Sequence, residues 1–249
     1  MKAARSHDYL HLIERWRALA ARWNWRMTAF AQESDQDIFV IEGGAAAGPA
    51  LYLSAGIHGD EAAATEGLLA WAERSAERLK DCAFTAFPCL NPWGLIMNSR
   101  TDRFGRDLNR SYNDPDCLQV LRQLEWLAGR RYDVAVMLHE DYDGSGFYLY
   151  ELGGPDSWGR SLVAAAEPFV GVESRPDIDG IPQEGGVVIR EVNPALLEEM
   201  PRHPEAIYLA MQGTPRCYTN ETPSEADIDA RVSAHAAVLD RVLDLLGTA

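Results

Sequence analysis

Two side chains that could bind one metal ion stand three residues apart, at His58 and Glu61. They follow the apolar run 51–55 and a glycine, and an alanine-rich helical pattern begins after them. An imidazole and a carboxylate at this spacing can both turn onto one divalent cation, and zinc accepts such a mixed set of nitrogen and oxygen ligands. A catalytic zinc takes three protein ligands and keeps one position for water. A third ligand is therefore expected after another strand.

The third ligand is expected at His139, which directly follows the buried strand predicted at 133–138. Ligands of α/β sheets bind beyond the carboxyl ends of the strands. The His58–Glu61 pair also follows a strand. A His-x-x-Glu pair alone would equally suit the surface of an ordinary helix. The distant histidine at a second strand end favours a His2Glu site that holds one zinc ion per chain.

Alternating strands and helices must position these ligands. Helical spacing or helix-start signals predict helices at 6–26, 61–80, from Asp114-Pro115 to about 129, at 156–167, and after a Ser224/Asp227 capping box. Apolar runs predict strands at 38–41, 51–55, 83–88, 133–138, 146–151, 187–189 and 216–221. The predicted fold class is α/β, a three-layer helix–sheet–helix sandwich around a mixed, largely parallel sheet.

A long segment without clear periodicity lies between two of the predicted strands, from Asn91 to about Asn113. Irregular stretches of this length are uncommon in compact domains and are often functional. This one is rich in residues that bind anions or orient other groups: Arg100, Arg103, Arg106, Asp107, Asn109 and Arg110.

Length and charge narrow the class of protein. The 249 residues predict one catalytic domain, 1–249, with 47% apolar and 24% charged residues. A net charge of −15 argues against a nucleic-acid partner and against an anionic membrane surface. No signal-peptide core and no membrane-spanning run is present. The four cysteines lie in apolar runs and form no C-x-x-C pair, which predicts buried free thiols and a cytoplasmic location.

The ordered set of motifs resembles the zinc metallocarboxypeptidases, the carboxypeptidase A-like enzymes. It also resembles their aspartoacylase and succinylglutamate desuccinylase relatives. The resemblance spans about residues 50 to 225. Its motifs are His58-Gly-Asp-Glu61, Asn91-Pro-Trp-Gly94, Arg100, Asp107-Leu-Asn-Arg110, Leu138-His139 and Thr219-Asn-Glu221-Thr-Pro.

The resemblance implies roles around the metal. His58, Glu61 and His139 correspond to the zinc ligands. Asp107 resembles the carboxylate that receives a ring N–H from the first histidine. Arg100 resembles the arginine that polarises the scissile carbonyl, and Arg103 is its rival because spacing in this segment varies.

The resemblance also implies how substrate is held and cut. Asn109 and Arg110 resemble the pair that binds a free carboxylate, for which arginine offers a planar bidentate fork. Glu221 resembles the general base, which takes a proton from the attacking water and passes it to the leaving amine. A site tyrosine is expected as well. Chain order favours Tyr208, with Tyr148, Tyr150 and Tyr218 as alternatives.

The resemblance thus predicts a zinc-dependent hydrolase that cleaves an amide or peptide bond next to a free carboxylate, acting on a small peptide. One alternative is an N-acyl-amino-acid deacylase of the aspartoacylase or succinylglutamate desuccinylase type. Another is a zinc-containing protein that binds peptide termini without cutting them. The acidic segment 140–143 is expected to be a solvated loop, with selection of an amine-bearing substrate as its alternative reading.

Overall fold

A computed structural model describes residues 5–113, 115–153 and 157–247. Its centre is an eight-stranded sheet in the order β1-β2-β4-β3-β5-β10-β6-β9, with β7 and β8 pairing separately. The strands are β1 (Arg26–Glu33), β2 (Gln36–Gly44), β3 (Ala50–Ser54), β4 (Ala83–Phe87), β5 (Val134–Asp141), β6 (Tyr148–Gly153), β7 (Asp177–Ile178), β8 (Ile181–Pro182), β9 (Val187–Arg190) and β10 (Arg216–Pro223).

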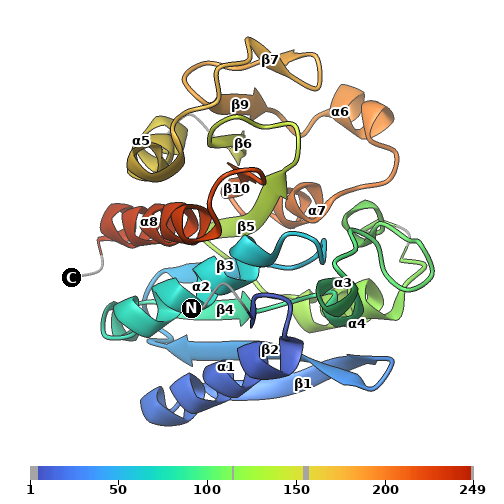
Figure 1. The fold of residues 1–249 in the computed structure, drawn as a ribbon, viewed down its shortest axis with the longest axis vertical. Coiled ribbons are helices and arrows are strands. Elements are labelled where there is room, and N and C mark those ends of the chain that lie inside the picture. The colour runs from blue at the N-terminus through green and yellow to red at the C-terminus, as the bar shows by residue number, and fades with distance from the viewer. Residues whose placement is uncertain (1–4, 114, 154–156, 248–249) are drawn as a thin grey trace.

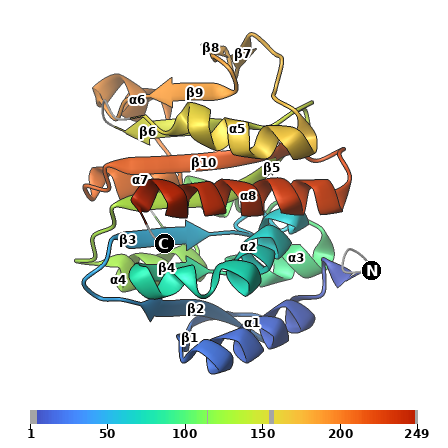
Figure 2. The same ribbon diagram turned by 90° about the vertical axis from the view of Figure 1, so that its left-hand side faces the viewer.

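Helices cover both faces of this sheet (Figures 1 and 2). One face carries α1 (Tyr9–Trp23), α2 (Ala62–Ser75), α5 (Gly159–Val170) and α8 (Ile228–Leu246), which lie in front of the strands in Figure 2. The other side holds α4 (Leu118–Leu127), α6 (Pro194–Glu199) and α7 (Glu205–Met211). The short α3 (Pro92–Met97) contacts α1 and β2. The predicted α/β helix–sheet–helix architecture is confirmed.

Two apolar cores hold the layers together. Val134, Val136 and Leu138 of β5 face the core shared with α2 and α8, while Ala135 and Met137 face the core shared with α4 and α7. A strand buried on both faces reads as a continuous apolar run because alternate side chains enter different cores. This is why β5 was recognisable in the sequence.

The strand directions bring the candidate residues to one edge. Strands β4, β3, β5 and β10 are mutually parallel, whereas β2 and β6 join this block antiparallel. The carboxyl ends of β3, β5 and β10 therefore lie side by side, and Glu221 of β10 pairs in register with His139 of β5. This edge carries the candidate site.

Several local predictions need correction. The strand β1 and the helices α3 and α7 were not expected, and β5 continues through His139 to Asp141 instead of ending before it. Helix α4 begins at Leu118, and the expected cap Asp114 lies outside the described residues, as does position 156. Helix α8 is capped by Asp227, which accepts hydrogen bonds from its first turn, so the Ser224 capping box does not form.

Two further expectations concern the cysteines and the membrane. All four cysteines are buried free thiols, as the sequence predicted. Within the described part of the chain, no helix combines the length and the apolar character needed to cross a bilayer.

Candidate active site

The loop that carries His58 is held rigidly at the end of β3. Gly56 has a φ of +61°, a left-handed conformation that glycine adopts without strain, and a Cβ there would lie 2.7 Å from Thr65. Gly59 packs directly on the backbone of Gly94, where a Cβ would come within 1.9 Å. The Gly59 N–H donates to the Ser99 carbonyl at 3.0 Å. These contacts fix the backbone on both sides of His58.

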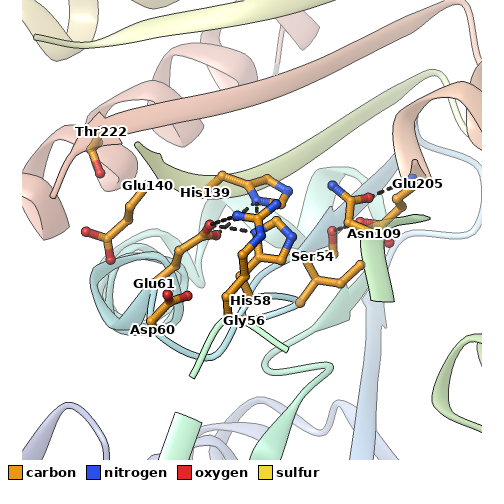
Figure 3. Close-up of polar contacts among 12 residues, drawn as sticks. Ser54, Gly56, His58, Asp60, Glu61, Asn109, His139, Glu140, Glu205 and Thr222 are labelled. Atoms are coloured by element: carbon orange, nitrogen blue, oxygen red, sulfur yellow. Dashed lines mark hydrogen bonds and ion pairs between the residues drawn. The ribbon is translucent and has the colours of Figure 1, made fainter. Parts of the chain in front are cut away.

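Three predicted ligands converge at the sheet edge (Figure 3). Nδ1 of His58 lies 2.6 Å from Oε1 of Glu61, and Nδ1 of His139 lies 2.9 Å from Oε2 of Glu61. The two Nδ1 atoms are 3.2 Å apart. All three side chains are buried, and their ligand atoms lie within 4.8 Å of one another. The three residues that the sequence analysis selected come from different elements: His58 from the loop after β3, Glu61 from the start of α2 and His139 from β5.

Asp107 fixes the orientation of the first histidine. Its Oδ1 lies 3.2 Å from Nε2 of His58 and also accepts the N–H of Asn109 at 2.9 Å. In the neutral ring with Nε2 protonated, Nε2–H would donate to this carboxylate and the Nδ1 lone pair would face Glu61 and His139. A ring nitrogen held in this way by a carboxylate is the usual arrangement behind a metal-binding histidine.

The charges of the cluster depend strongly on one another. Burial lowers the pKa of His58, but the charge of Glu61 and the hydrogen bonds to Asp107 and Glu61 outweigh it and raise that pKa to about 9. Burial raises the pKa of Glu61, and the two histidines overcome this and bring it to about 2. Without a cation the histidine must carry a proton to offset the buried carboxylate. A metal ion would replace that proton.

The donor set fits a divalent metal of the zinc type. Two imidazole nitrogens and one carboxylate are borderline-soft ligands that suit zinc, and three protein ligands leave a coordination position open. Oε2 of Glu61 is buried and accepts no hydrogen bond in the described part of the chain, although Nδ1 of His139 is 2.9 Å away. A short distance without a hydrogen bond is expected where the lone pairs of Oε2 and of Nδ1 would both face one cation.

A cavity of about 520 Å³ opens beside the cluster, and Arg100, Asn109, Arg110 and Glu221 line it. Arg100 donates to Asp107 at 3.1 Å and comes within 3.7 Å of Oε1 of Glu61. Its predicted rival does not reach the cavity, because Arg103 donates to the hydroxyl of Ser34 at 3.1 Å. Between the two arginines, Arg100 is the one beside the candidate metal ligands.

Asn109 is held by a buried polar network that the sequence did not reveal. Its Oδ1 accepts the N–H of Glu205 at 2.9 Å, and its amide nitrogen points toward the histidines (Figure 3). The carboxylate of Glu205 is buried and accepts hydrogen bonds from Ser54 at 2.7 Å, from Gln123 at 2.8 Å and from Tyr52. Glu205 therefore locks the segment that carries Asn109 onto the end of β3.

Glu221 lies on the cavity side of β10, next to His139. Burial raises its pKa to about 8, and the carboxylates of Glu61 and Asp141 act in the same direction, while His139 and Arg100 oppose them. A carboxylate of raised pKa is suited to taking up and releasing a proton. A cation held by the neighbouring ligands would lower that pKa again.

Comparisons with known proteins agree with this geometry. Residues 47–156 match the model of the succinylglutamate desuccinylase/aspartoacylase catalytic domain. The chain superposes on a Shewanella denitrificans OS217 protein described as a metallopeptidase, with a TM-score of 0.88, 21% identity, and coverage of 98% of this chain and 92% of that one. A metallo-carboxypeptidase from Burkholderia cenocepacia gives a TM-score of 0.69 at 16% identity, with 94% and 69% covered.

The chain has the fold of the metallocarboxypeptidases, and residues 47–156 are similar to the succinylglutamate desuccinylase/aspartoacylase catalytic domain. The fold likeness extends to bovine thrombin-activatable fibrinolysis inhibitor, solved in complex with tick carboxypeptidase inhibitor, with a TM-score of 0.67, 13% identity, and 97% and 98% covered. The comparison with curated proteins gives no match. The resemblance stated from the motifs is confirmed, including the desuccinylase and aspartoacylase branch.

The tyrosines of this carboxypeptidase-like site differ from the one that chain order favoured. Tyr148 and Tyr150 of β6 line the cavity, and the hydroxyl of Tyr150 donates to Asp179 at 2.7 Å. Tyr208 does not line it, because its ring packs on Tyr112 with centroids 6.0 Å apart. The geometry gives no support to a substrate-binding role for Tyr208. Its rivals on β6 were visible in the sequence only by their nearness to His139.

Proposed function

We propose that this protein is a zinc-dependent hydrolase that cleaves an amide bond next to a free carboxylate, in the manner of a metallocarboxypeptidase. The observation that carries the proposal is one cavity that combines three converging metal ligands, a carboxylate beside them and an arginine available for an anion. These are the His58–Glu61–His139 cluster, Glu221 and Arg110. A zinc ion bound by the cluster would supply Lewis acidity and lower the pKa of a water molecule.

The remaining chemistry falls to side chains of the cavity. Glu221 is placed to accept the proton of the attacking water and to deliver it to the leaving amine, which completes the cleavage of the C–N bond. The guanidinium of Arg100 stands beside the ligands, where it can stabilise the negative charge that develops on the carbonyl oxygen. Its hydrogen bonds to Asp107 hold it there before substrate binds.

Arg110 is the residue best suited to the substrate carboxylate. It lines the cavity and donates to the carbonyl of Asn109 at 2.8 Å, and it pairs with no carboxylate in the described part of the chain. An arginine that forms no internal ion pair can offer a bidentate fork to an anion. Asn109 adds an amide N–H donor from the same short 3-10 helix, Leu108–Arg110. The proposed substrate is therefore a small peptide with a free terminal carboxylate.

A second candidate function is deacylation of an N-acyl amino acid. The match of residues 47–156 to the desuccinylase/aspartoacylase domain favours it specifically. Both reactions use the same ligands and general base. They differ in which part of the substrate carries the recognised carboxylate, so the same cavity can be tested for both.

A substrate panel separates the two candidates. Zinc-loaded protein is assayed on dipeptides and on N-acetyl and N-succinyl amino acids, with the His139→Ala variant as the control for contaminating activity. Preferential cleavage of dipeptides supports the carboxypeptidase, and preferential release of acetate or succinate supports the deacylase. Absence of zinc from the purified protein, together with no turnover after zinc is added, would overturn both.

A further inference from the structure

Glu140 follows a metal ligand directly, yet it does not take part in the chemistry of the cavity. It was expected to begin a solvated acidic loop. Instead it lies within β5 and is only 3% exposed, and its carboxylate points away from the two histidines (Figure 3). Alternation along the strand sends the side chain of His139 to one face and that of Glu140 to the face covered by α2 and α8.

Both carboxylate oxygens of Glu140 are bound on that face. Oε1 accepts the backbone N–H of Ala63 at 2.6 Å, and Oε2 accepts a hydrogen bond from the guanidinium of Arg231 on α8. Arg231 is oriented in turn by the carbonyl of Ala226 at 2.9 Å. Each oxygen of the buried carboxylate thus has a hydrogen-bond donor, and the ion pair with Arg231 offsets part of the cost of taking a carboxylate out of water.

The contact with Ala63 matters because of where α2 begins. Its N-cap residue is Glu61, which makes no side-chain hydrogen bond to the helix, since its carboxylate is turned to the histidines. The first N–H groups of a helix need an acceptor from elsewhere. Glu140 supplies that acceptor from β5, the strand that also carries His139.

We propose that Glu140 is a positioning residue that sets Glu61 against His139 by joining the first turn of α2 to the end of β5, with Arg231 as its counter-ion. The metal-related part of this inference rests on the proposed function. One hydrogen bond to Ala63 links the segment that carries the carboxylate ligand to the segment that carries the second histidine. The ligand distances then do not depend on the loop 55–61 alone.

Two double variants isolate that hydrogen bond. E140Q/R231M and E140M/R231M both replace the two partners of the buried ion pair, so neither variant leaves an unpaired buried charge. Glutamine and methionine are similar in size, so the two variants should pack alike at position 140. They differ in whether residue 140 can accept the N–H of Ala63. The measurements are competition of zinc with a chromophoric chelator, the visible spectrum of the cobalt-substituted protein, and amide hydrogen exchange in the first turn of α2.

We expect E140M/R231M to bind zinc about tenfold to a hundredfold more weakly than wild type, the range found when groups that orient ligands are removed. Its cobalt spectrum should change and its Ala63 amide should exchange faster. E140Q/R231M should remain close to wild type in all three. Equal zinc affinity and equal exchange in the two double variants would overturn the proposal.

A matched control tests whether loss of any buried glutamate has the same effect. Glu151 on β6 is also 3% exposed and accepts hydrogen bonds from Ser157 at 2.6 Å and Tyr218 at 3.1 Å. E151M should lower stability and leave zinc affinity unchanged. Wild-type protein that binds no zinc would remove the proposed function, whereas the exchange of Ala63 in metal-free protein would still decide whether Glu140 holds α2.

Discussion

The two faces of the sheet behave differently at the same strand ends. On the cavity face, the charges of Glu61 and Asp141 raise the pKa of Glu221, whereas those of His139 and Arg100 lower it. On the rear face, which α2 and α8 cover, the next residue of each strand contacts a polar side chain of α8. Glu140 pairs with Arg231, and the hydroxyl of Thr222 lies 3.1 Å from Nε2 of His235.

This difference follows from the alternation of side chains along a strand. Residues one apart in sequence project to opposite faces, so a ligand can be followed at once by a residue that stabilises it from behind. The cavity face carries the candidate reactive groups, and the rear face carries buried polar groups that bond to residues of α2 and α8. Substitutions on the front should therefore change chemistry, and those behind should change stability or geometry.

The largest effect is expected from the metal ligands. His139→Ala should lower bound zinc from about one ion per chain to a small fraction, because a catalytic site needs its three protein ligands. The matched control is His235→Leu, which removes a histidine that is also fully buried but lies on the rear face. Metal analysis of both proteins checks this. Zinc retained by His139→Ala would contradict the ligand assignment.

The next largest effect should appear in turnover without a change in metal content. Glu221→Gln keeps the size of the side chain and removes proton transfer, which contributes about a hundredfold to ten-thousandfold in rate. The measurement is kcat on the best substrate of the panel, with zinc content determined on the same sample. Full turnover by Glu221→Gln would contradict its role as general base. No turnover by wild type on any substrate of the panel would favour the third reading of the sequence, a protein that binds peptide termini without cutting them.

Removal of Arg110 should act on substrate recognition. A charge-assisted bidentate contact is worth about 1.5–3 kcal/mol, so Arg110→Ala should lower kcat/KM about tenfold to over a hundredfold with unchanged zinc. Wild type should discriminate against a substrate whose terminal carboxylate is amidated, and the variant should discriminate little. Arg103→Ala is the control, since that side chain contacts Ser34 outside the cavity. Equal discrimination by wild type and Arg110→Ala would move the carboxylate site elsewhere.

The smallest effect should come from the rear face, as a dependence of stability on pH. Burial lowers the pKa of His235 to about 3, against an ordinary value of 6.5, and the charges of Glu61, His139 and Arg231 act on it as well. Between about pH 3 and pH 6.5, His235 is protonated in the unfolded chain and neutral in the folded chain. The contribution of His235 to stability therefore falls as pH drops from about 6.5 toward 3, by up to about 1.4 kcal/mol per pH unit.

Denaturant unfolding of metal-free wild type and His235→Leu at pH 7, 6 and 5 measures this dependence. The variant should lose less stability than wild type on acidification. Parallel curves for the two proteins would mean that His235 is protonated in the folded state, contrary to its burial. The activity of His235→Leu near neutral pH should be close to that of wild type. This result would show that the rear face affects stability and the cavity face affects activity.

The fold was predictable from the sequence wherever a segment had a strong and unambiguous hydrophobic pattern. The apolar runs of β3 and β5 are buried on both faces, and the residues at their ends were visible as candidate ligands because polar groups interrupt those runs. The strand β1 was missed because most of its residues stay partly exposed on the edge of the sheet. The helix α7 has only seven residues, too few to show a period.

Roles that depend on tertiary neighbours were not predictable. Glu140 reads as part of an acidic loop, and only the closeness of Arg231 and Ala63 gives it another meaning. Glu205 is buried because Tyr52, Ser54 and Gln123 surround it, and these residues are distant in sequence. The favoured Tyr208 was chosen by chain order, which does not determine which side chains reach a cavity.

The position of β10 in the sheet has a consequence for how the molecule folds. This strand is the last along the chain, yet it lies between β5 and β6, which are made long before it. Until it arrives, β5 and β6 have no neighbour to join them, and each exposes an unpaired edge of the kind that associates with other chains. Insertion of a final strand into the middle of a sheet requires contacts between distant residues, which slows folding. During synthesis the two histidines can therefore meet before Glu221 is in place, so the cavity is complete only after β10 has joined the sheet.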